Sequence, residues 1–357
     1  MKKIVLTGGG SSGHVTPNLA LIPALQAHDW SVEYIGSERG MERAMLEAEQ
    51  IPYHAIQTGK LRRYFSWQNM LDPLRVLVGI AQAYVLLRRI KPQVVFSKGG
   101  FVALPVVVGA WLARIPIVAH ESDFSIGLAN RLSFYFVNTI CVTFSAACAN
   151  LTNPAKGVVT GTPIRESLFQ GDRTKGFQHC GFQADKPCLL VMGGGQGAQS
   201  INLCIRQALP RLLPSMHVIH ICGPGKADLS FNQQEGYFQL EYANTELADL
   251  FAASDWVVSR AGANALYELL ALAKPHILIP LPIRQSRGDQ IENARYFERL
   301  GASYVIPDED LNPEVLVQTI QTLQNNQAQI QAAIAALNIQ PAVQPIMKIL
   351  EEYATPA

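Results

Sequence analysis

The sequence predicts an α/β protein in which two Rossmann-like, doubly wound parallel-sheet domains face a cleft. Apolar segments of strand length alternate with helical segments along the chain, which is typical of parallel sheets. A glycine-rich loop follows the first strand at residues 8–13, and a second follows an equivalent strand at residues 193–197. The length of 357 residues also suits two domains better than one core.

The first half alternates strands and helices from its start. After a strand at residues 2–7 and the glycine turn, a helix is expected at residues 17–28, and another near residues 41–50 follows a second strand. The expected strands after the first are residues 32–35, 94–97, 115–119, 140–143 and 157–160. The strand at 115–119 is expected to end before His120 and Glu121.

The pattern then restarts with a strand at residues 187–192, a glycine loop and a helix reaching residue 209. Further strands are expected at residues 218–222, 256–259 and 276–280. We therefore predict an N-terminal domain at residues 1–160, joined by a terminal helix at about 341–357, and a C-terminal domain at residues 161–340.

Composition indicates a well-packed globular protein, with 48% hydrophobic and 16% charged residues. The apolar run in the opening segment is too short for a signal peptide. No uncharged apolar run is as long as a membrane-spanning helix. The six cysteines show no CxxC spacing, so we expect buried thiols, not disulfides or a zinc site.

Charge is distributed unevenly although the net charge is +1. Residues 1–160 carry 15 basic and 9 acidic side chains, a net of +6, and the remainder carries −5. Seven basic residues and one acidic residue lie between Lys60 and Lys91. This concentration indicates that the N-terminal half meets something anionic.

The first glycine loop leaves a dinucleotide-binding oxidoreductase open as an alternative. Its pattern, Gly8-x-Gly10-x-x-Gly13, fits the NAD fingerprint, which requires an acidic residue at the far end of the second strand. Glu33 lies at the near end, and Glu38 is followed by Arg39. Glycines required only for a tight strand-to-helix turn explain the pattern equally simply.

Polar residues near two later helix starts suit a nucleotide sugar. Glu268 lies on the helix after the turn Ser259-Arg260-Ala261-Gly262-Ala263, where its carboxylate can accept from two ribose hydroxyls. Gln290 offers a donor and an acceptor to sugar hydroxyls. The alternatives are an exposed carboxylate favoured by the helix dipole and an ordinary surface glutamine.

Four motifs in order make the chain resemble one family. They are Gly9-Gly10-Ser11-Ser12-Gly13-His14-Val15, His120-Glu121, Gly193-Gly194-Gly195-Gln196-Gly197-Ala198 and Ser259-Arg260-Ala261-Gly262-Ala263. The chain is similar to the undecaprenyldiphospho-muramoylpentapeptide β-N-acetylglucosaminyltransferases, peptidoglycan enzymes of the GT-B fold that add N-acetylglucosamine to lipid I. The resemblance extends from the first strand to the final helix.

The resemblance implies that UDP-N-acetylglucosamine is the donor, held mainly by the C-terminal half. The residues that match the family's donor contacts, or lie beside them, are Ser11, Ser12, Gly13, Arg165, Gly195, Asn244, Ala263, Leu266, Glu268 and Gln290. Three positions depart from the family. Gly195 replaces a frequent Ser, and Asn244 replaces a frequent apolar residue. Ser122-Asp123 stands where many members have Gln-Asn.

The resemblance also implies inversion at the anomeric carbon by attack of a muramoyl C4 hydroxyl, which needs a general base. His14 is the first candidate, since a helix N-terminus favours a neutral imidazole, and Asp123 and Glu121 are second. A phosphate-binding role for His14 remains the alternative. Lys98, Gly99 and Gly100 are expected to face the diphosphate of a polyprenyl-linked muramoyl-pentapeptide acceptor. We expect no cofactor and no metal, because no DxD-type pair or His cluster is present.

Basic residues interleaved with aromatic and aliphatic ones predict contact with an anionic membrane surface. The residues expected there are Lys60, Arg62, Arg63, Phe65, Trp67, Leu74 and Arg75. The alternative is an ordinary helix with a basic outer face. Because no recognition motif accompanies the patch, nucleic acid is not expected as a partner.

We therefore expect a peripheral enzyme on the cytoplasmic face of the bacterial membrane. The sequence leaves other functions open. They are those of a glycolipid synthase or UDP-sugar epimerase of the same fold, an NAD-dependent oxidoreductase, and a non-catalytic UDP-sugar sensor.

Overall fold

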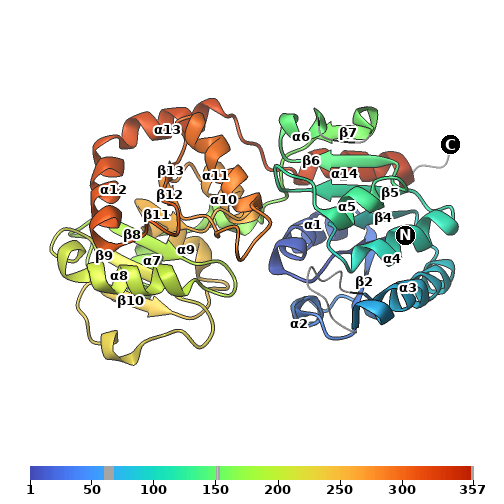
Figure 1. The fold of residues 1–357 in the computed structure, drawn as a ribbon, viewed down its shortest axis with the longest axis horizontal. Helices are drawn as coiled ribbons and strands as arrows, with labels where there is room; N and C mark the ends of the chain where they lie inside the picture. Colours follow the sequence, from blue (N-terminus) through green and yellow to red (C-terminus); the bar gives the residue numbers. More distant parts are fainter. Residues whose placement is uncertain (60–67, 150, 152, 355–357) are drawn as a thin grey trace. The chain divides into compact units, whose positions relative to one another are not determined.

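A computed structural model describes residues 1–59, 68–149, 151 and 153–354. Backbone contacts divide the chain into two compact units, which are described separately (Figure 1). Unit 1 contains residues 1–165 and 341–357, and unit 2 contains residues 166–340. The predicted α/β class is confirmed, because each unit holds one sheet whose described strand pairs are all parallel.

The sheet of unit 1 has seven strands in the order β3-β2-β1-β4-β5-β6-β7. Strand order reverses beside the central strand β1, and ligands of open α/β sheets bind at such a switch point, beyond the carboxyl ends of the strands. The strands are β1 (Lys2–Thr7), β2 (Trp30–Ser37), β3 (Tyr53–Ile56), β4 (Val94–Ser97), β5 (Ile117–Glu121), β6 (Thr139–Val142) and β7 (Gly157–Val159).

Helices cover the sheet of unit 1, and the last of them comes from the end of the chain. The helix α14, red in Figure 1, packs Ile346 and Leu350 into the same buried cluster as Ile4 and Leu21. Glu351 on α14 also accepts a hydrogen bond from the indole of Trp30 at 2.7 Å. The helices are α1 (Thr16–Ala27), α2 (Met41–Ala48), α3 (Gln68–Ile90), α4 (Ala103–Leu112), α5 (Leu128–Ser133), α6 (Ser145–Ala149) and α14 (Val343–Ala354).

Unit 2 repeats the plan with six strands in the order β10-β9-β8-β11-β12-β13. The strands are β8 (Cys188–Met192), β9 (His217–Ile221), β10 (Tyr237–Leu240), β11 (Trp256–Ser259), β12 (His276–Leu278) and β13 (Tyr304–Val305). The helices are α7 (Arg173–Cys180), α8 (Gln199–Leu212), α9 (Leu247–Ala253), α10 (Ala263–Ala271), α11 (Asp289–Arg299), α12 (Pro313–Asn325) and α13 (Gln327–Ala336), with a 3-10 turn η3 (Glu166–Gln170) at the start.

One expected strand is displaced by two residues. The strand expected at 115–119 is β5 (Ile117–Glu121), so His120 and Glu121 lie inside the strand and not after it. The cause is the end of α4. Ile115 still donates its N–H to the carbonyl of Ala110, and Arg114 has a left-handed φ of 59° that turns the chain out of the helix.

All six cysteines are free thiols, and five of them are buried. Within the described ranges, no helix is long and apolar enough to span a bilayer. The same part of the chain contains no cluster of three or more His, Cys, Asp or Glu side chains suited to a metal ion.

Candidate functional site

In unit 1, three loops meet at the carboxyl ends of adjacent strands β1, β4 and β5. The strand register places Thr7 opposite Ser97, and Ser97 opposite Ala119. The first glycine loop and the loop beginning at Lys98 are in direct contact. Gly100, at φ +82°, packs against the carbonyl of Gly9, and a Cβ there would lie 2.9 Å from Cδ2 of His14. The fold therefore places His14 close to the Lys98–Gly100 segment, and a shared site for these residues stays a prediction.

His14 closes a short 3-10 turn η1 (Ser12–His14) directly before α1. Its side chain is half-buried, and its backbone N–H donates to the carbonyl of Ser11 at 3.1 Å. The imidazole thus lies directly before the N-terminus of α1. This position suits the predicted general base, whose role stays a prediction.

Glu121 is occupied by the loop that follows it. The carboxylate is 3% exposed and accepts from Asn130 Nδ2 at 2.8 Å, from the N–H of Asp123 at 3.1 Å and from the N–H of Gly127 at 3.3 Å. Such a carboxylate is poorly placed to collect a proton from a bulky acceptor. Asp123 is less buried and is the more accessible of the two carboxylates.

His120 is fully buried and holds the segment that follows β7. Its Nε2 lies 2.8 Å from the carbonyl of Gly161, to which it donates as the neutral tautomer. Burial, together with the nearby charge of Lys98, lowers the pKa of His120 well below its usual value. This histidine is therefore suited to a structural role.

Lys98 differs from the expectation that it faces an acceptor diphosphate. Its side chain is 1% exposed, and burial lowers its pKa although Glu121 and Asp123 act in the opposite direction. Gly99 is buried beside Asn130, and Gly100 is partly accessible. In this structure Lys98 lies beneath the loops, so only Gly100 of the three predicted acceptor residues reaches the surface.

A buried carboxylate under the first glycine loop bears on the dinucleotide alternative. Glu42, at the start of α2, is 0% exposed and accepts from the N–H and the hydroxyl of Ser37 and, at 3.5 Å, from the N–H of Gly10. A Cβ at Gly9 would lie 2.8 Å from its Cδ. A carboxylate at this place competes with a pyrophosphate for the Gly10 N–H. Glu38, the residue weighed for the ribose, is exposed at the end of the second strand.

In unit 2, the second glycine loop leads from β8 into α8. Gly195 is exposed at its tip, where only the backbone is available for a contact. Gly197, at φ +67°, lies against the turn after β9, where a Cβ would be 2.7 Å from Cα of Gly223. The 14-residue helix α8 then presents the free N–H groups of its first turn at this loop.

Arg260 of the Ser259–Ala263 motif ties the neighbouring loops together. Its guanidinium forms a buried ion pair with Asp308 at 2.6 Å and donates to the Ser200 hydroxyl at 3.0 Å, and Ser200 donates to Asp308 at 2.7 Å. It also bonds the carbonyl of Ile279 at 3.1 Å. Sequence reasoning missed this function, because Asp308 lies 48 residues away and belongs to no motif.

The starts of α10 and α11, which carry predicted donor residues, lie close together. Gln290 accepts from the N–H of Leu281 at 3.0 Å, and its Nε2 lies 3.8 Å from a Cβ placed on Gly262. Asn293, one turn later, bonds the carbonyl of Ala261 at 3.2 Å. Glu268 lies in the second turn of α10 with 8% exposure.

The remaining predicted donor residues differ in accessibility. Leu266 and Ala263 have buried side chains, so a ligand meets their backbone at most, and Asn244 is exposed in the loop after β10. Arg165 belongs to unit 1, where its Nε is buried and has no hydrogen-bond partner among the described residues. Ser11 is exposed and Gly13 is half-buried, beside His14. The side chain of Ser12 lies outside the described part.

Two of the predicted membrane residues can be placed. Leu74 and Arg75 lie exposed on α3. Lys60, Arg62, Arg63, Phe65 and Trp67 fall outside the described residues.

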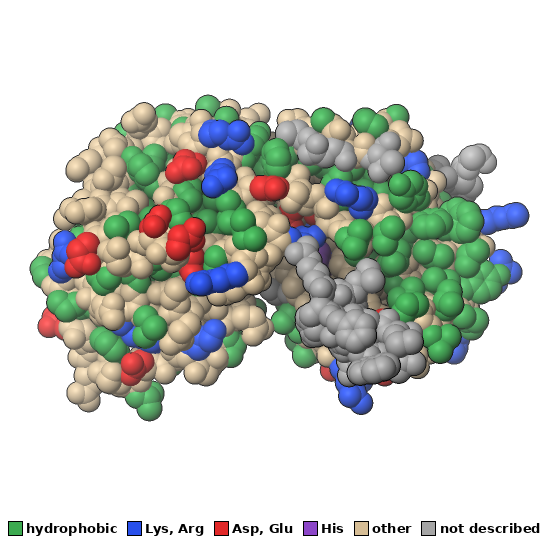
Figure 2. All heavy atoms as spheres, in the orientation of Figure 1, with side chains coloured by type: hydrophobic (Ala, Val, Ile, Leu, Met, Phe, Trp, Pro, Cys, Tyr) green, Lys and Arg blue, Asp and Glu red, His purple; other side chains and the backbone are tan. Residues whose placement is uncertain are grey.

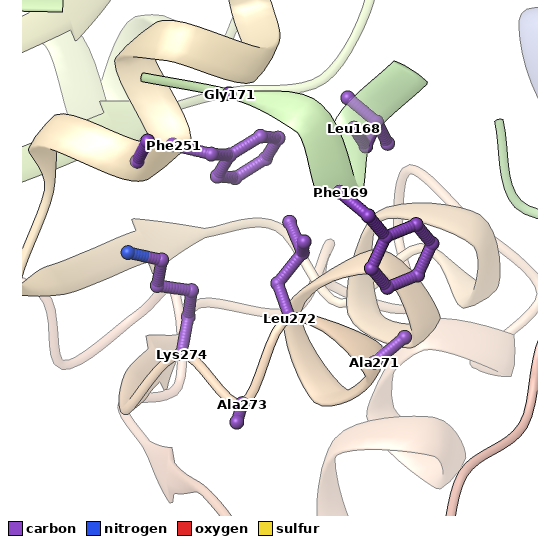
Figure 3. A pocket seen from close by; sticks show the side chains of 9 residues that line it. Leu168, Phe169, Gly171, Phe251, Ala271, Leu272, Ala273 and Lys274 are labelled. Carbon is purple, nitrogen blue, oxygen red and sulfur yellow. The ribbon is translucent and has the colours of Figure 1, made fainter. Parts of the chain in front are cut away.

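A separate apolar pocket of about 260 Å³ lies in unit 2, with Phe169, Phe251 and Leu272 in its lining (Figure 3). It is bounded by η3, α9 and the carboxyl end of α10, whereas the predicted donor residues of α10 lie nearer its start. None of the predicted site residues lines it.

Two family models match the chain. The glycosyltransferase family 28 N-terminal domain matches residues 4–142, and the glycosyltransferase family 28 C-terminal domain matches residues 188–349.

Curated relatives match over nearly the whole chain. A Legionella pneumophila protein is 59% identical over 98% of this chain and 97% of its own length. It is named UDP-N-acetylglucosamine–N-acetylmuramyl-(pentapeptide) pyrophosphoryl-undecaprenol N-acetylglucosamine transferase. A Bacillus cereus protein with the same name, numbered 2, is 48% identical over 99% of this chain and its full length.

Solved structures agree in fold. The Acinetobacter baumannii MurG crystal structure superposes with a TM-score of 0.76 at 25% identity, covering 99% of this chain and all of the other. A Neisseria meningitidis UDP-GlcNAc 2-epimerase bound to UDP-GlcNAc gives a TM-score of 0.68 at 14% identity, over 99% of this chain and 100% of the epimerase, a likeness of fold alone.

Proposed function

The chain belongs to the family of UDP-N-acetylglucosamine–N-acetylmuramyl-(pentapeptide) pyrophosphoryl-undecaprenol N-acetylglucosamine transferases, and on this premise we propose that unit 2 binds the nucleotide sugar and unit 1 the lipid-linked acceptor. The protein is a UDP-N-acetylglucosamine-dependent glycosyltransferase of peptidoglycan synthesis, which converts lipid I to lipid II. The fold and the recognised family are those expected from the sequence. The roles of individual residues are the proposal.

The observation that carries the donor assignment is the gathering of helix starts in unit 2. Helices α8, α10 and α11 follow the carboxyl ends of β8, β11 and β12, and Gln290 of α11, which accepts from the N–H of Leu281, lies beside Gly262 at the start of α10. Helix N-termini of this kind stabilise a diphosphate without a metal ion. Glu268 would accept from the ribose hydroxyls, and Gln290 would bond the sugar.

The proposed reaction is a single in-line displacement. The C4 hydroxyl of the muramoyl sugar attacks the anomeric carbon of N-acetylglucosamine while the bond from that carbon to the β-phosphate oxygen of UDP breaks. His14 takes the hydroxyl proton, and the new glycosidic bond is β because the donor bond is α. UDP leaves with the bonding electron pair, and its charge is stabilised by the helix N-termini and by Arg165.

His14 is preferred to Glu121 as the base because of their surroundings. The His14 ring borders the partly accessible Gly100, whereas the Glu121 carboxylate already accepts three hydrogen bonds. Glu121 is better suited to hold the loop on which Asp123 lies. Asp123 remains the second candidate base.

Membrane contact is proposed for the outer face of α3, α4 and α5 in unit 1, where α4 packs against both α3 and α5. Apolar side chains gather over these helices in Figure 2, although a monomeric protein normally hides such groups. The exposed residues of this apolar patch are Leu74, Leu77, Val85, Trp111, Leu112, Leu128, Leu132 and Tyr135. Arg75, Arg88, Arg89, Arg114 and Arg131 lie on or next to the same helices, so the patch suits an anionic bilayer.

A peripheral position at the cytoplasmic face of the bacterial membrane fits both substrates. The donor is a soluble nucleotide sugar, and the acceptor is anchored by its polyprenyl tail. The apolar patch would bring unit 1 to the surface from which the acceptor projects.

The test offers radiolabelled UDP-N-acetylglucosamine and a lipid I analogue to the wild-type chain and to Glu268→Ala. We expect transfer by the wild type and at least a tenfold higher KM for the donor in the variant, with the KM for the acceptor unchanged. A wild type that transfers no sugar would refute the function. A variant with wild-type kinetics would refute only the ribose assignment.

A further inference from the structure

Lys226 holds the second glycine loop although it belongs to none of the motifs found in the sequence. It ends the turn Gly223-Pro224-Gly225-Lys226 after β9. Its ammonium donates to the carbonyl of Gln196 at 2.7 Å and to the carbonyl of Gly197 at 3.2 Å. One side chain therefore fixes two consecutive peptide units of the loop.

Fixing the carbonyl groups also fixes the N–H groups. In a trans peptide the C=O and N–H bonds point in opposite directions. The carbonyls of Gln196 and Gly197 point toward Lys226, so the N–H groups of Gly197 and Ala198 point away from it. The N–H of Gly197 closes the loop on the carbonyl of Gly194 at 2.8 Å. That of Ala198, directly before the first turn of α8, lies against Gly193, where a Cβ would be 2.3 Å from the Ala198 nitrogen.

Close backbone packing lets Lys226 reach both carbonyls. Gly197 and Gly223 have φ values of +67° and +93°, which favour glycine. A Cβ at Gly223 would lie 2.5 Å from Cα of Gly197 and 2.6 Å from the carbonyl oxygen of Gln196. The turn that carries Lys226 thus lies directly against the loop.

Lys226 is itself held by the helix that the loop begins. Arg206, on α8 and 9% exposed, donates to the carbonyl of Lys226 at 2.7 Å and to Gln239 at 3.1 Å. The contacts form a closed path from α8 through Arg206 and Lys226 to the glycine loop and back to α8. Such a path limits the number of conformations open to the loop.

We propose that Lys226 is a positioning residue for the donor diphosphate. It fixes the backbone of Gln196 and Gly197 that leads into α8, and with it the position of the N–H groups of that helix's first turn, before the nucleotide binds, and it adds a positive charge behind the loop. This role rests on the proposed function of unit 2 as the donor domain. Preorganised donors bind an anion more strongly because no ordering is required at the moment of binding.

The kinetic test compares Lys226→Met with Lys186→Met. Lys186 is a matched control, since its ammonium bonds a single backbone carbonyl, that of Leu213, at the other end of α8. For Lys226→Met we expect the KM for UDP-N-acetylglucosamine to rise about tenfold or more, with the KM for the acceptor unchanged. Lys226→Arg, which keeps the charge and two or more donors, should stay within about threefold of the wild type. A donor KM for Lys226→Met within twofold of the wild type, or an equal rise in Lys186→Met, would overturn the proposal.

Two measurements without acceptor separate this proposal from the function it rests on. Calorimetry should show UDP binding weakened about tenfold or more in Lys226→Met, while uridine binding is unchanged. Hydrogen exchange of residues 193–201 in the nucleotide-free protein should be faster in this variant and unchanged in Lys186→Met. Slower or equal exchange would mean that Lys226 does not order the loop. Intact UDP binding by a wild type that transfers no sugar would count against the proposed function alone.

Discussion

At the residue scale, His14 and Glu121, two of the candidate bases of unit 1, differ in what surrounds them. His14 lies at the end of a short turn with its ring against Gly100, and the Glu121 carboxylate is enclosed by the loop from Asp123 to Asn130. Substitution of each should therefore change a different property of the enzyme.

For His14→Gln we expect kcat to fall by about 10² to 10⁴, the usual contribution of a positioned general base. Glutamine keeps a polar side chain but cannot take the proton. UDP binding, measured by calorimetry, should stay within a factor of two. A kcat within a factor of two of the wild type would point to Asp123 as the base.

For Glu121→Ala we expect lower stability and not a selective loss of chemistry. The substitution leaves Asn130 and the N–H groups of Asp123 and Gly127 without their acceptor, at a cost of about 1–3 kcal/mol for each group left buried and unsatisfied. Glu121→Gln retains acceptor oxygen and should recover most of the stability. Urea unfolding measures the free energy of unfolding of both variants. Loss of activity in a fully stable Glu121→Gln would favour direct proton transfer by this residue.

At the element scale, the loops at the carboxyl ends of the strands in unit 2 are joined by a few buried polar side chains. Arg260 connects the end of β11 with α8 through Ser200 and with the segment after β13 through Asp308. Removing one partner from such a buried pair leaves an uncompensated charge, which is more costly than removing both.

We therefore expect Arg260→Met to lower the free energy of unfolding by about 3–5 kcal/mol. The double variant Arg260→Met/Asp308→Leu should recover part of this loss. Arg173→Met is the control, because its ion pair with Asp255 is more exposed and should be worth at most about 1 kcal/mol. Chemical denaturation measures all three. Equal effects of the two single variants would show that the Arg260 pair is no more important than a surface contact.

The outer face of α3 gives a second expectation at this scale. Leu74→Glu/Leu77→Glu should reduce cosedimentation with vesicles rich in phosphatidylglycerol by at least tenfold, because it adds two negative charges to the apolar patch. Leu229→Glu, at an even more exposed leucine of unit 2, should leave binding unchanged. Transfer to a short-chain, water-soluble acceptor should be normal in every variant. Equal vesicle binding by the wild type and the double variant would refute the membrane assignment.

Periodicity in the sequence predicted the elements that are strongly apolar and missed the weak ones. Segments such as Val94–Ser97 and Trp256–Ser259 were predicted with their observed bounds, because buried strands of parallel sheets form continuous apolar runs. The strands β3, β10 and β13 were not predicted. All three are short and are only partly buried, so their apolar signal is weak.

The candidate site shows the same limit. Glycine loops have a local signature, so both could be found from the sequence. The roles of Glu42, Lys226 and Arg260 depend on contacts with residues that lie 30 or more positions away in the sequence. No local pattern encodes such a contact. The burial of Lys98 was missed for a related reason. A lysine after a strand is normally exposed, and only the packing of neighbouring loops encloses this one.

At the scale of the whole molecule, the two units share more than a glycine loop. In unit 1, Asn18 on α1 bonds the carbonyl of Thr7 at 3.2 Å and the hydroxyl of Tyr34 at 3.1 Å. In unit 2, Asn202 on α8 bonds the carbonyl of Cys222 at 2.8 Å and the ring of His220 at 3.0 Å. Each helix that follows a glycine loop is thus tied by an asparagine to an aromatic ring of the adjacent strand.

The path of the chain makes unit 1 depend on its last helix. The chain leaves unit 1 after Arg165 and returns at Pro341, and α14 then completes the buried cluster around β1 and α1. We expect Leu350→Ala, at a fully buried position, to lower the free energy of unfolding by about 2–5 kcal/mol. Leu203→Ala, at a half-exposed leucine on α8, should change it by less than about 0.5 kcal/mol.

Hydrogen exchange resolved by peptide can locate the effect of Leu350→Ala. Peptides of unit 1, including β1 and α1, should lose protection, whereas those of unit 2 should keep it, because each unit has its own core. UDP should raise protection from exchange in unit 2 of both the wild type and Leu350→Ala. It should not restore the lost protection in unit 1 of the variant. Equal loss of protection in both units would mean that the two cores unfold as one cooperative structure. The expectation that each unit keeps its own stability would then be wrong.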